Sequence, residues 1–118
     1  DGLVENVEIY NIDCETRIHA GGWWGKGEGF VICSDNTTGN IKNVTIRDSK
    51  FIEENPSLIV DCENITLQNV DFEYKKGHTH EYYYGKMDLQ PNHPQLLKAP
   101  FNIGDTLYTD KVKNFKNI

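Results

Sequence analysis

The sequence predicts an all-β fold of solenoid type, in which short strands stack as successive coils. A pattern of one asparagine followed by alternating apolar residues recurs along the chain, and such repeats are typical of solenoids. No stretch of adequate length carries apolar residues at the helical spacing i, i+3, i+4 and i+7. A β-sandwich would need hairpin turns of the Asn-Gly or Asp-Gly type, and the only such dipeptide is Asp1-Gly2.

Each copy of the repeat opens with an asparagine. When the residue after this asparagine is counted as offset 0, apolar residues lie at offsets 0, 2, 5 and 7. Alternation between offsets 0 and 2 indicates one short strand with alternate side chains inward, and offsets 5 and 7 indicate a second. The jump from 2 to 5 indicates a bend between them. The three copies are Val7, Ile9, Ile12, Cys14; Val44, Ile46, Ser49, Phe51; and Ile65, Leu67, Val70, Phe72, with one polar exception at Ser49.

The opening residues are Asn6, Asn43, Asn64 and Asn114, at intervals of 37, 21 and 50 residues. The shortest interval fits one coil, and the longer ones fit a coil with an insertion or two coils. A second polar position follows each of the first three after five residues, at Asn11, Asp48 and Asn69. Asn and Asp tolerate the left-handed backbone conformation. We therefore expect both sets to stack at corners of the solenoid, the first as a polar ladder.

Composition favours a single domain spanning residues 1–118. The net charge of −6 with scattered basic residues argues against nucleic acid or an anionic membrane surface as the main partner. Three cysteines, Cys14, Cys33 and Cys62, form neither a metal-binding spacing nor a disulfide framework. We expect buried thiols and neither metal nor cofactor. Free thiols favour a reducing compartment only weakly, so localisation stays open.

The stretch from Thr16 to Phe30 holds the candidate site. It contains both tryptophans and five glycines. Glycines on this scale indicate a backbone that turns sharply or is approached closely. Aromatic rings among polar groups suit a sugar-binding cleft, although the tryptophans can also pack on the solenoid flank. The predicted substrate-binding residues are Arg17, His19, Trp23, Trp24, Lys26 and Glu28.

These motifs resemble glycoside hydrolase family 28, which includes polygalacturonases and rhamnogalacturonases. The similarity lies in the run Glu15-Thr16-Arg17-Ile18-His19, the run Gly22-Trp23-Trp24-Gly25-Lys26-Gly27-Glu28 and the coil Ile41 to Ile46. Met87 to Pro91 resembles a segment near the C-terminus of that family. The resemblance implies a right-handed parallel β-helix, here about four to five coils, cut from the C-terminal portion of a larger domain.

The resemblance also implies roles. Arg17 matches the arginine of the family's Arg-Ile-Lys motif, which binds the substrate carboxylate, and His19 stands where the lysine would be. The family's catalytic aspartates lie upstream in motifs that include Asp-Asp, followed by Gly-His-Gly, and this chain has neither. No catalytic residue is therefore assigned. We expect a pectinase-like fragment, inactive alone, whose parent hydrolyses polysaccharide with paired carboxylates.

Two other classes remain open: a non-catalytic carbohydrate-binding β-helix module and a purely structural one. Residues 75–105 are expected to form a long loop excursion. Within it, His78 and His80 could bind a metal, although a solvated loop is favoured. Cutting a solenoid between coils exposes unpaired strands, so self-association through that end is also expected. An oligo- or polysaccharide is the expected ligand.

Overall fold

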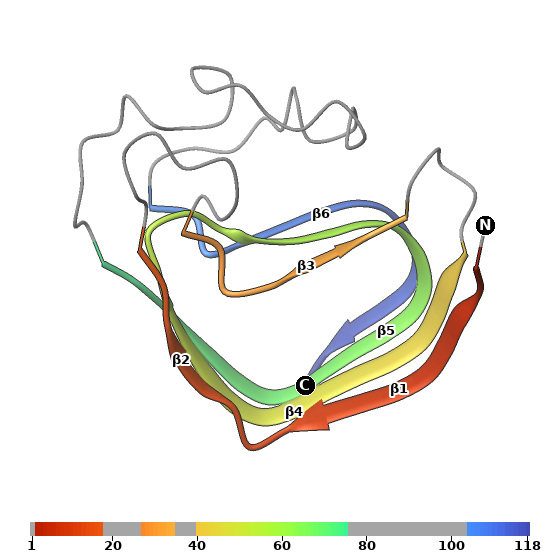
Figure 1. The fold of residues 1–118 in the computed structure, drawn as a ribbon, viewed down its shortest axis with the longest axis horizontal. Helices are drawn as coiled ribbons and strands as arrows, with labels where there is room; N and C mark the ends of the chain where they lie inside the picture. The colour runs from red at the N-terminus through yellow and green to blue at the C-terminus, as the bar shows by residue number, and fades with distance from the viewer. Residues whose placement is uncertain (1, 18–26, 35–39, 76–103) are drawn as a thin grey trace.

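The computed structural model describes residues 2–17, 27–34, 40–75 and 104–118. These residues form a single all-β sheet (Figure 1). Its strands are β1 (Val4–Tyr10), β2 (Asp13–Glu15), β3 (Val31–Cys33), β4 (Ile41–Glu53), β5 (Ser57–Tyr74) and β6 (Leu107–Asn117). Every strand pair in this part of the chain is parallel. The predicted all-β class and parallel strand arrangement are confirmed.

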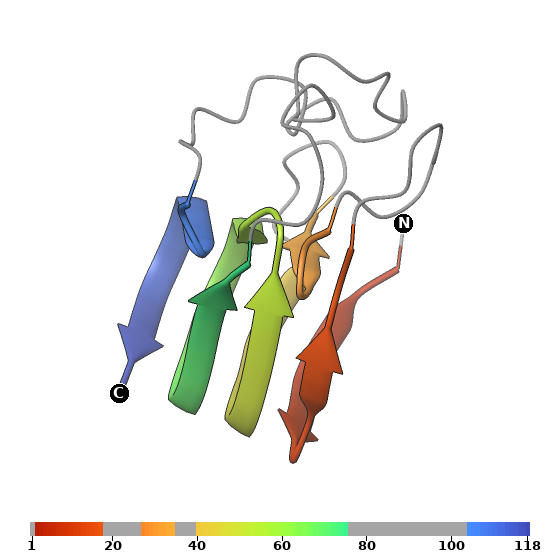
Figure 2. The same cartoon turned by 90° about the vertical axis from the view of Figure 1, so that its left-hand side faces the viewer.

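The sheet is curled, and its long strands follow the same bent path one beside another (Figures 1 and 2). β4 lies between β1 with β2 on one side and β5 on the other, while β5 also pairs with β3 and β6. Val7 pairs with Val44, Val44 with Ile65, and Ile65 with Phe115. Equivalent positions of the sequence repeats therefore pair with one another in the register of the sheet.

Left-handed backbone conformations occur where the asparagine pattern predicts them. The column Asn6, Asn43, Asn64 and Asn114 has φ angles of 59, 58, 55 and 54°. The second column, Asn11, Asp48 and Asn69, has φ angles of 57, 51 and 53°. The left-handed backbone expected at both sets is confirmed. Side-chain hydrogen bonds join all four asparagines of the first column, and Asp48 with Asn69 in the second. Asp61 and Lys111, with φ angles of 54 and 53°, form a third bend that the repeat did not reveal.

The core lies inside the curl. It includes five of the predicted inward residues and also Leu58, Ile59, Val60 and Cys62 of β5, which the repeat did not predict. Val44, Ile46, Phe51, Ile65 and Leu67 are buried. The rings of Phe30, Phe51 and Phe72 form a cluster with centroid separations of 5.2 to 5.9 Å. Ser49, the one polar residue at an inward position of the repeats, is also buried. Its hydroxyl is satisfied there because it donates to the Arg47 carbonyl at 2.9 Å and accepts from the Ile12 amide at 3.1 Å.

The first strands are more exposed than the repeat implies. Ile9 is 36% exposed, whereas its register partner Ile46 is 1% exposed, and Ile12 is 38% exposed. The reason is position: in the described chain, β1 and β2 have a neighbouring strand on only one side. Between β5 and β6, residues 76–103 lie outside the described residues, and so does almost all of the expected excursion at 75–105.

Candidate functional site

A strip of charged side chains lies on the outer side of the sheet, across β2, β4, β5 and the residues that follow β2 and β5. Side chains alternate along a strand, and Cys14, Phe51 and Phe72 pack into the core. Their neighbours therefore face outward. We call this set the charged face: Asp13, Glu15, Arg17, Lys50, Asp71, Glu73 and Lys75.

At one end of the charged face, a single carboxylate holds two cations. Lys75 Nζ lies 3.0 Å from Glu15 Oε2, and Arg17 Nη2 lies 3.5 Å from the same oxygen. Lys75, and to a smaller extent Arg17, hold the pKa of Glu15 below its ordinary value. The Arg17 side chain remains 61% exposed. The cluster therefore carries one more positive than negative charge, on groups that water and solutes reach.

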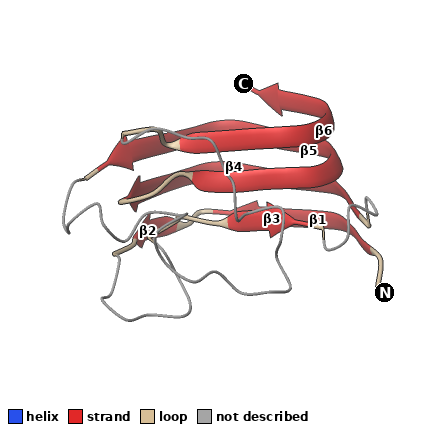
Figure 3. Ribbon diagram, turned by 90° about the horizontal axis from the view of Figure 1, so that it is seen from above, coloured by secondary structure: helices blue, strands red, loops and turns tan. Residues whose placement is uncertain are grey.

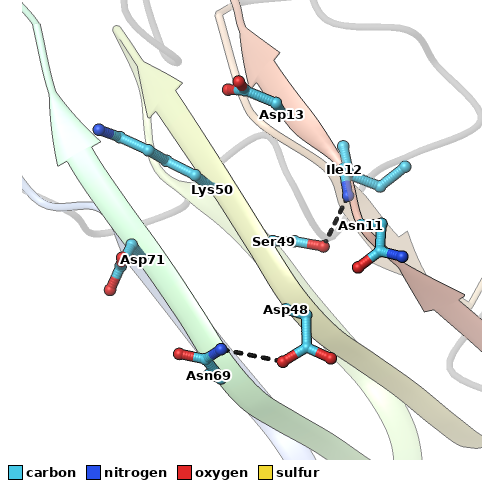
Figure 4. Close-up of a pocket in the computed structure, with 8 residues that line it drawn as sticks. All are labelled: Asn11, Ile12, Asp13, Asp48, Ser49, Lys50, Asn69 and Asp71. Atoms are coloured by element: carbon cyan, nitrogen blue, oxygen red, sulfur yellow. Dashed lines mark hydrogen bonds between the residues drawn. The ribbon is translucent and has the colours of Figure 1, made fainter.

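Further along the charged face, a lysine lies between two aspartates. Lys50 of β4 pairs in register with Asp13 of β2 and with Asp71 of β5. The Lys50 Nζ lies 3.6 Å from Glu73 Oε2. Figure 4 shows Asp13, Lys50 and Asp71 side by side on three neighbouring strands. Hydrogen-bond donors and acceptors thus alternate across the strands at this level.

These residues border an open depression of about 400 Å³. At its corner side, Asn69 Nδ2 donates to Asp48 Oδ1 at 2.9 Å. That bond, together with Arg47, keeps the pKa of Asp48 below its ordinary value. The depression offers amide, hydroxyl, carboxylate and ammonium groups, which suit a ligand rich in hydroxyls. The lining residues are Asn11, Ile12, Asp13, Asp48, Ser49, Lys50, Asn69 and Asp71 (Figure 4).

A buried carboxyl group lies on the inner side of the sheet, at the end of the charged face where Glu15 lies. Glu53, the last residue of β4, is 1% exposed. Its Oε1 accepts hydrogen bonds from the Ser57 hydroxyl and, at 3.1 Å, from the Gly29 amide. Its Oε2 has no hydrogen-bond partner among the described residues. Burial raises the pKa of Glu53 to about 7, and the nearby charge of Glu28 adds to the rise.

The backbone of residues 27–30 packs closely against the Glu53 carboxyl group. The Gly27 carbonyl accepts from the Thr16 hydroxyl at 2.7 Å and from the amides of Glu54 and Asn55, each at 3.1 Å. Gly27 has a φ of 84°. A Cβ added at Gly29 would lie 2.5 Å from Glu53 Oε1. The sharp turn and close approach expected of this glycine-rich stretch are confirmed at these two positions.

Only two of the six predicted site residues belong to the described part of the chain. Arg17 follows β2 on the charged face. Glu28 precedes β3, is partly buried and acts on the pKa of Glu53. The predicted residues His19, Trp23, Trp24 and Lys26 lie outside the described residues, as do His78 and His80.

Several residues of the site were missed by the sequence reasoning. Glu15, Lys50 and Lys75 contact one another or their neighbours only because the register brings distant segments together; Lys75 and Glu15 are 60 residues apart in the chain. For Glu15 and Lys50 the available signal was the alternation itself, because each lies beside a predicted inward residue; Lys75 lies three residues beyond the last repeat position, Phe72, and had no such signal. Glu53 carried no such signal, since its partners Gly29 and Ser57 belong to two different segments.

Within the described ranges, no helix has the length and apolar character needed to cross a membrane. Over the same ranges, no group of three or more His, Cys, Asp or Glu residues is arranged to hold a metal ion. Neither a protein-family model, nor a curated protein, nor a solved structure matches this chain.

Proposed function

We propose that this chain is the C-terminal part of a right-handed parallel β-helix, of about four to five coils, that binds polysaccharide. The parent fold would be of the glycoside hydrolase family 28 type, acting on pectin-like substrates. Support for the helical architecture comes from the corner columns at intervals of 37, 21 and 50 residues and from the parallel register that joins them. The motif resemblance supports the family.

The observation that carries the ligand class is the excess positive charge around Glu15. Arg17 and Lys75 share this one carboxylate, and the Arg17 side chain is 61% exposed, so Glu15 alone does not use all the N–H donors of the guanidinium. A guanidinium matches a carboxylate with two parallel hydrogen bonds. A sugar acid such as galacturonate would therefore dock its carboxylate on Arg17 and extend its hydroxyls along the charged face.

The remainder of the charged face suits the neutral parts of such a polymer. The depression beside Lys50 presents donors and acceptors on adjacent strands. Neighbouring parallel strands lie about 4.8 Å apart, so a sugar chain crossing them would meet polar groups at every strand. Positioning is all that this face supplies; the acid and base carboxylates would come from upstream coils of the parent.

The experiment is a titration of the 118-residue chain with oligogalacturonate and with neutral oligosaccharides of equal length, followed by tryptophan fluorescence. Oligogalacturonate should bind, and Arg17→Ala should weaken binding about tenfold or more, the usual scale for losing a charge-assisted hydrogen bond. The matched control is Lys42→Ala, which also removes one exposed positive charge. Lys42 pairs with Glu5 at the start of β4, away from the charged face and the depression, so its loss should leave binding unchanged.

Two outcomes would redirect the proposal. Equal weakening by Arg17→Ala and Lys42→Ala would mean that only overall charge attracts the ligand. Binding of no sugar at all would favour the structural alternative, in which the ion pairs of the charged face serve to tie neighbouring strands together. Lys50 with Glu73 and Lys75 with Glu15 already do so.

A further inference from the structure

Two backbone hydrogen bonds place Arg17 and Lys75 on opposite sides of β4. The amide of Thr16 donates to the Ile52 carbonyl at 2.9 Å, and the amide of Lys75 donates to the Glu53 carbonyl at 2.8 Å. These two acceptors are the last residues of β4. The chain after β2 and the chain after β5 are therefore both held to the end of β4. Figure 2 shows β2 and the ends of β4 and β5 side by side, and Figure 3 shows the same layers from above.

The side chains of these two cations meet on one oxygen atom. Lys75 Nζ lies 3.0 Å and Arg17 Nη2 lies 3.5 Å from Glu15 Oε2. Because β2 and β5 pair with opposite sides of β4 and neighbouring strands lie about 4.8 Å apart, Lys75 reaches across β4 to make this contact. Glu73, two positions before Lys75, pairs instead with Lys50 at 3.6 Å. A carboxylate at the place of Glu15 is thus contacted from both sides of β4.

Glu15 is a charged group that a solute can replace. Its pKa is held below its ordinary value by Lys75 and, to a smaller extent, by Arg17, so the group is a carboxylate at neutral pH. All three side chains are at least 39% exposed. Ion pairs with this much exposure are weak. A dissolved carboxylate can therefore compete with Glu15 for the same donors.

The charge of this cluster depends on Glu15 alone. Among the described residues, no second carboxylate forms an ion pair with Arg17 or Lys75. With Glu15 in contact, the three groups carry one net positive charge; with Glu15 displaced, the two cations present a charge of +2 to a ligand. A guanidinium and an ammonium bind a ligand carboxylate by the same charge-assisted hydrogen bonds that they make to a side chain.

We propose that Glu15 occupies, in the free chain, the place that a ligand carboxylate takes on binding, and that Arg17 and Lys75 together select that carboxylate. This rests on the proposed function and deepens it. Lys75 becomes a second specificity-determining residue, 60 residues from Glu15 in the sequence. Binding exchanges one carboxylate for another, so Glu15 lowers the affinity for every acidic ligand. A neutral sugar has no group that replaces Glu15 and gains nothing from the two cations.

Isothermal titration calorimetry with oligogalacturonate compares the wild-type chain with Glu15→Gln. The variant removes the competing charge and keeps the shape of the side chain, so it should bind about two- to fivefold more tightly, the range set by the strength of exposed ion pairs. The control is Glu5→Gln, which makes the same change in net charge and breaks the 3.8 Å pair with Lys42; it should bind as the wild type does. Methyl-esterified oligogalacturonate, which carries no carboxylate, should not distinguish the three proteins. Circular dichroism verifies that each is folded.

The role of Lys75 is tested in the Glu15→Gln background, where its ion pair with Glu15 no longer exists. Lys75→Met keeps the apolar stem and removes the charge, so it should weaken oligogalacturonate binding at least about twofold. Lys75→Arg keeps the charge and should retain the affinity. Because no Glu15 charge remains in these variants, a loss reports contact with the ligand. Equal affinity of the Met and Arg variants would overturn the assignment of Lys75.

The outcomes separate this inference from the proposed function. Weaker binding by Glu15→Gln overturns the inference, because Glu15 would then position Arg17 for the ligand. An equal gain by Glu5→Gln also overturns it, since net charge alone would explain the effect. A wild-type chain that binds no oligogalacturonate removes the proposed function; binding by Glu15→Gln in that case still upholds the displacement of Glu15, whereas no binding by either protein overturns both.

Discussion

Replacing Glu53 by Gln should change how the stability of this protein depends on pH. Glu53 is buried, and its pKa lies at about 7 against an ordinary value of 4.5. A carboxyl whose pKa is raised by folding binds more protons in the folded than in the unfolded chain between these values. Its contribution to stability is therefore complete below about pH 4.5, is lost as the pH rises towards 7, and is absent above that.

The size of this loss follows from the shift. One pKa unit corresponds to about 1.4 kcal/mol, so the rise from 4.5 to about 7 is worth at most about 3 kcal/mol. Relaxation of the site around the charged carboxylate reduces this to about 1–3 kcal/mol. Gln stays neutral at every pH and keeps the carbonyl oxygen that accepts from Ser57 and Gly29. The variant should therefore lose less stability between pH 5 and 8 than the wild type, by about that amount.

Urea unfolding at a series of pH values, followed by far-ultraviolet circular dichroism, measures the difference. Glu15 and Asp48, whose pKa values are lowered, contribute the opposite slope at acidic pH, but they are common to both proteins and cancel. Glu63→Gln, on the exposed side of β5, serves as the control and should keep the wild-type profile. Parallel pH profiles for the wild type and Glu53→Gln would refute the reasoning.

Three further outcomes follow from the packing. Gly29→Ala places a Cβ 2.5 Å from Glu53 Oε1 and 2.9 Å from Phe51 Cδ1, so chemical unfolding should show a loss of about 1–3 kcal/mol, against none for Gly2→Ala, which meets no atom within 4 Å. Asn64→Ala should cost about 1 kcal/mol more than Asn64→Gly in the same assay, because its φ is 55°; equal losses would assign the effect to the ladder alone. In a variant whose other two cysteines are serine, Cys62 should resist a thiol reagent until the chain unfolds, since burial raises its pKa to about 12; rapid labelling of the native chain would contradict this.

The local sequence pattern predicted several strands and bends of the sheet. Asn6, Asn43, Asn64 and Asn114 mark bends that few other residues accept, and the alternating apolar residues after each bend decide which side faces inward. Because all four members of this column are asparagines, the strand register could be predicted from the sequence without any structure. The third bend escaped because Asp61 and Lys111 share no residue type.

The site was less accessible to this reasoning. The pairing of Glu15 with Lys75 depends on three strands being in register, and a carboxylate and an ammonium on a polar surface have no distinguishing pattern in the chain. The hydrogen bonds to Glu53 require Gly29, which lies 24 residues away in the sequence, to be placed at the end of β4. Side-chain chemistry of this kind emerges only after tertiary structure has placed the segments.

The asparagine column also bears on how such a chain tolerates change in length. Neighbouring members of the column are 37, 21 and 50 residues apart, yet their side chains stack at nearly equal hydrogen-bond distances of 2.9 to 3.1 Å. The asparagine positions therefore keep the same geometry in every strand, while the number of residues between them varies. The entropic cost of a longer connection rises only slowly, by about 0.6 kcal/mol for each doubling. Insertions and exchanges between these positions are thus a route by which new surfaces can be added without disturbing the register of the strands.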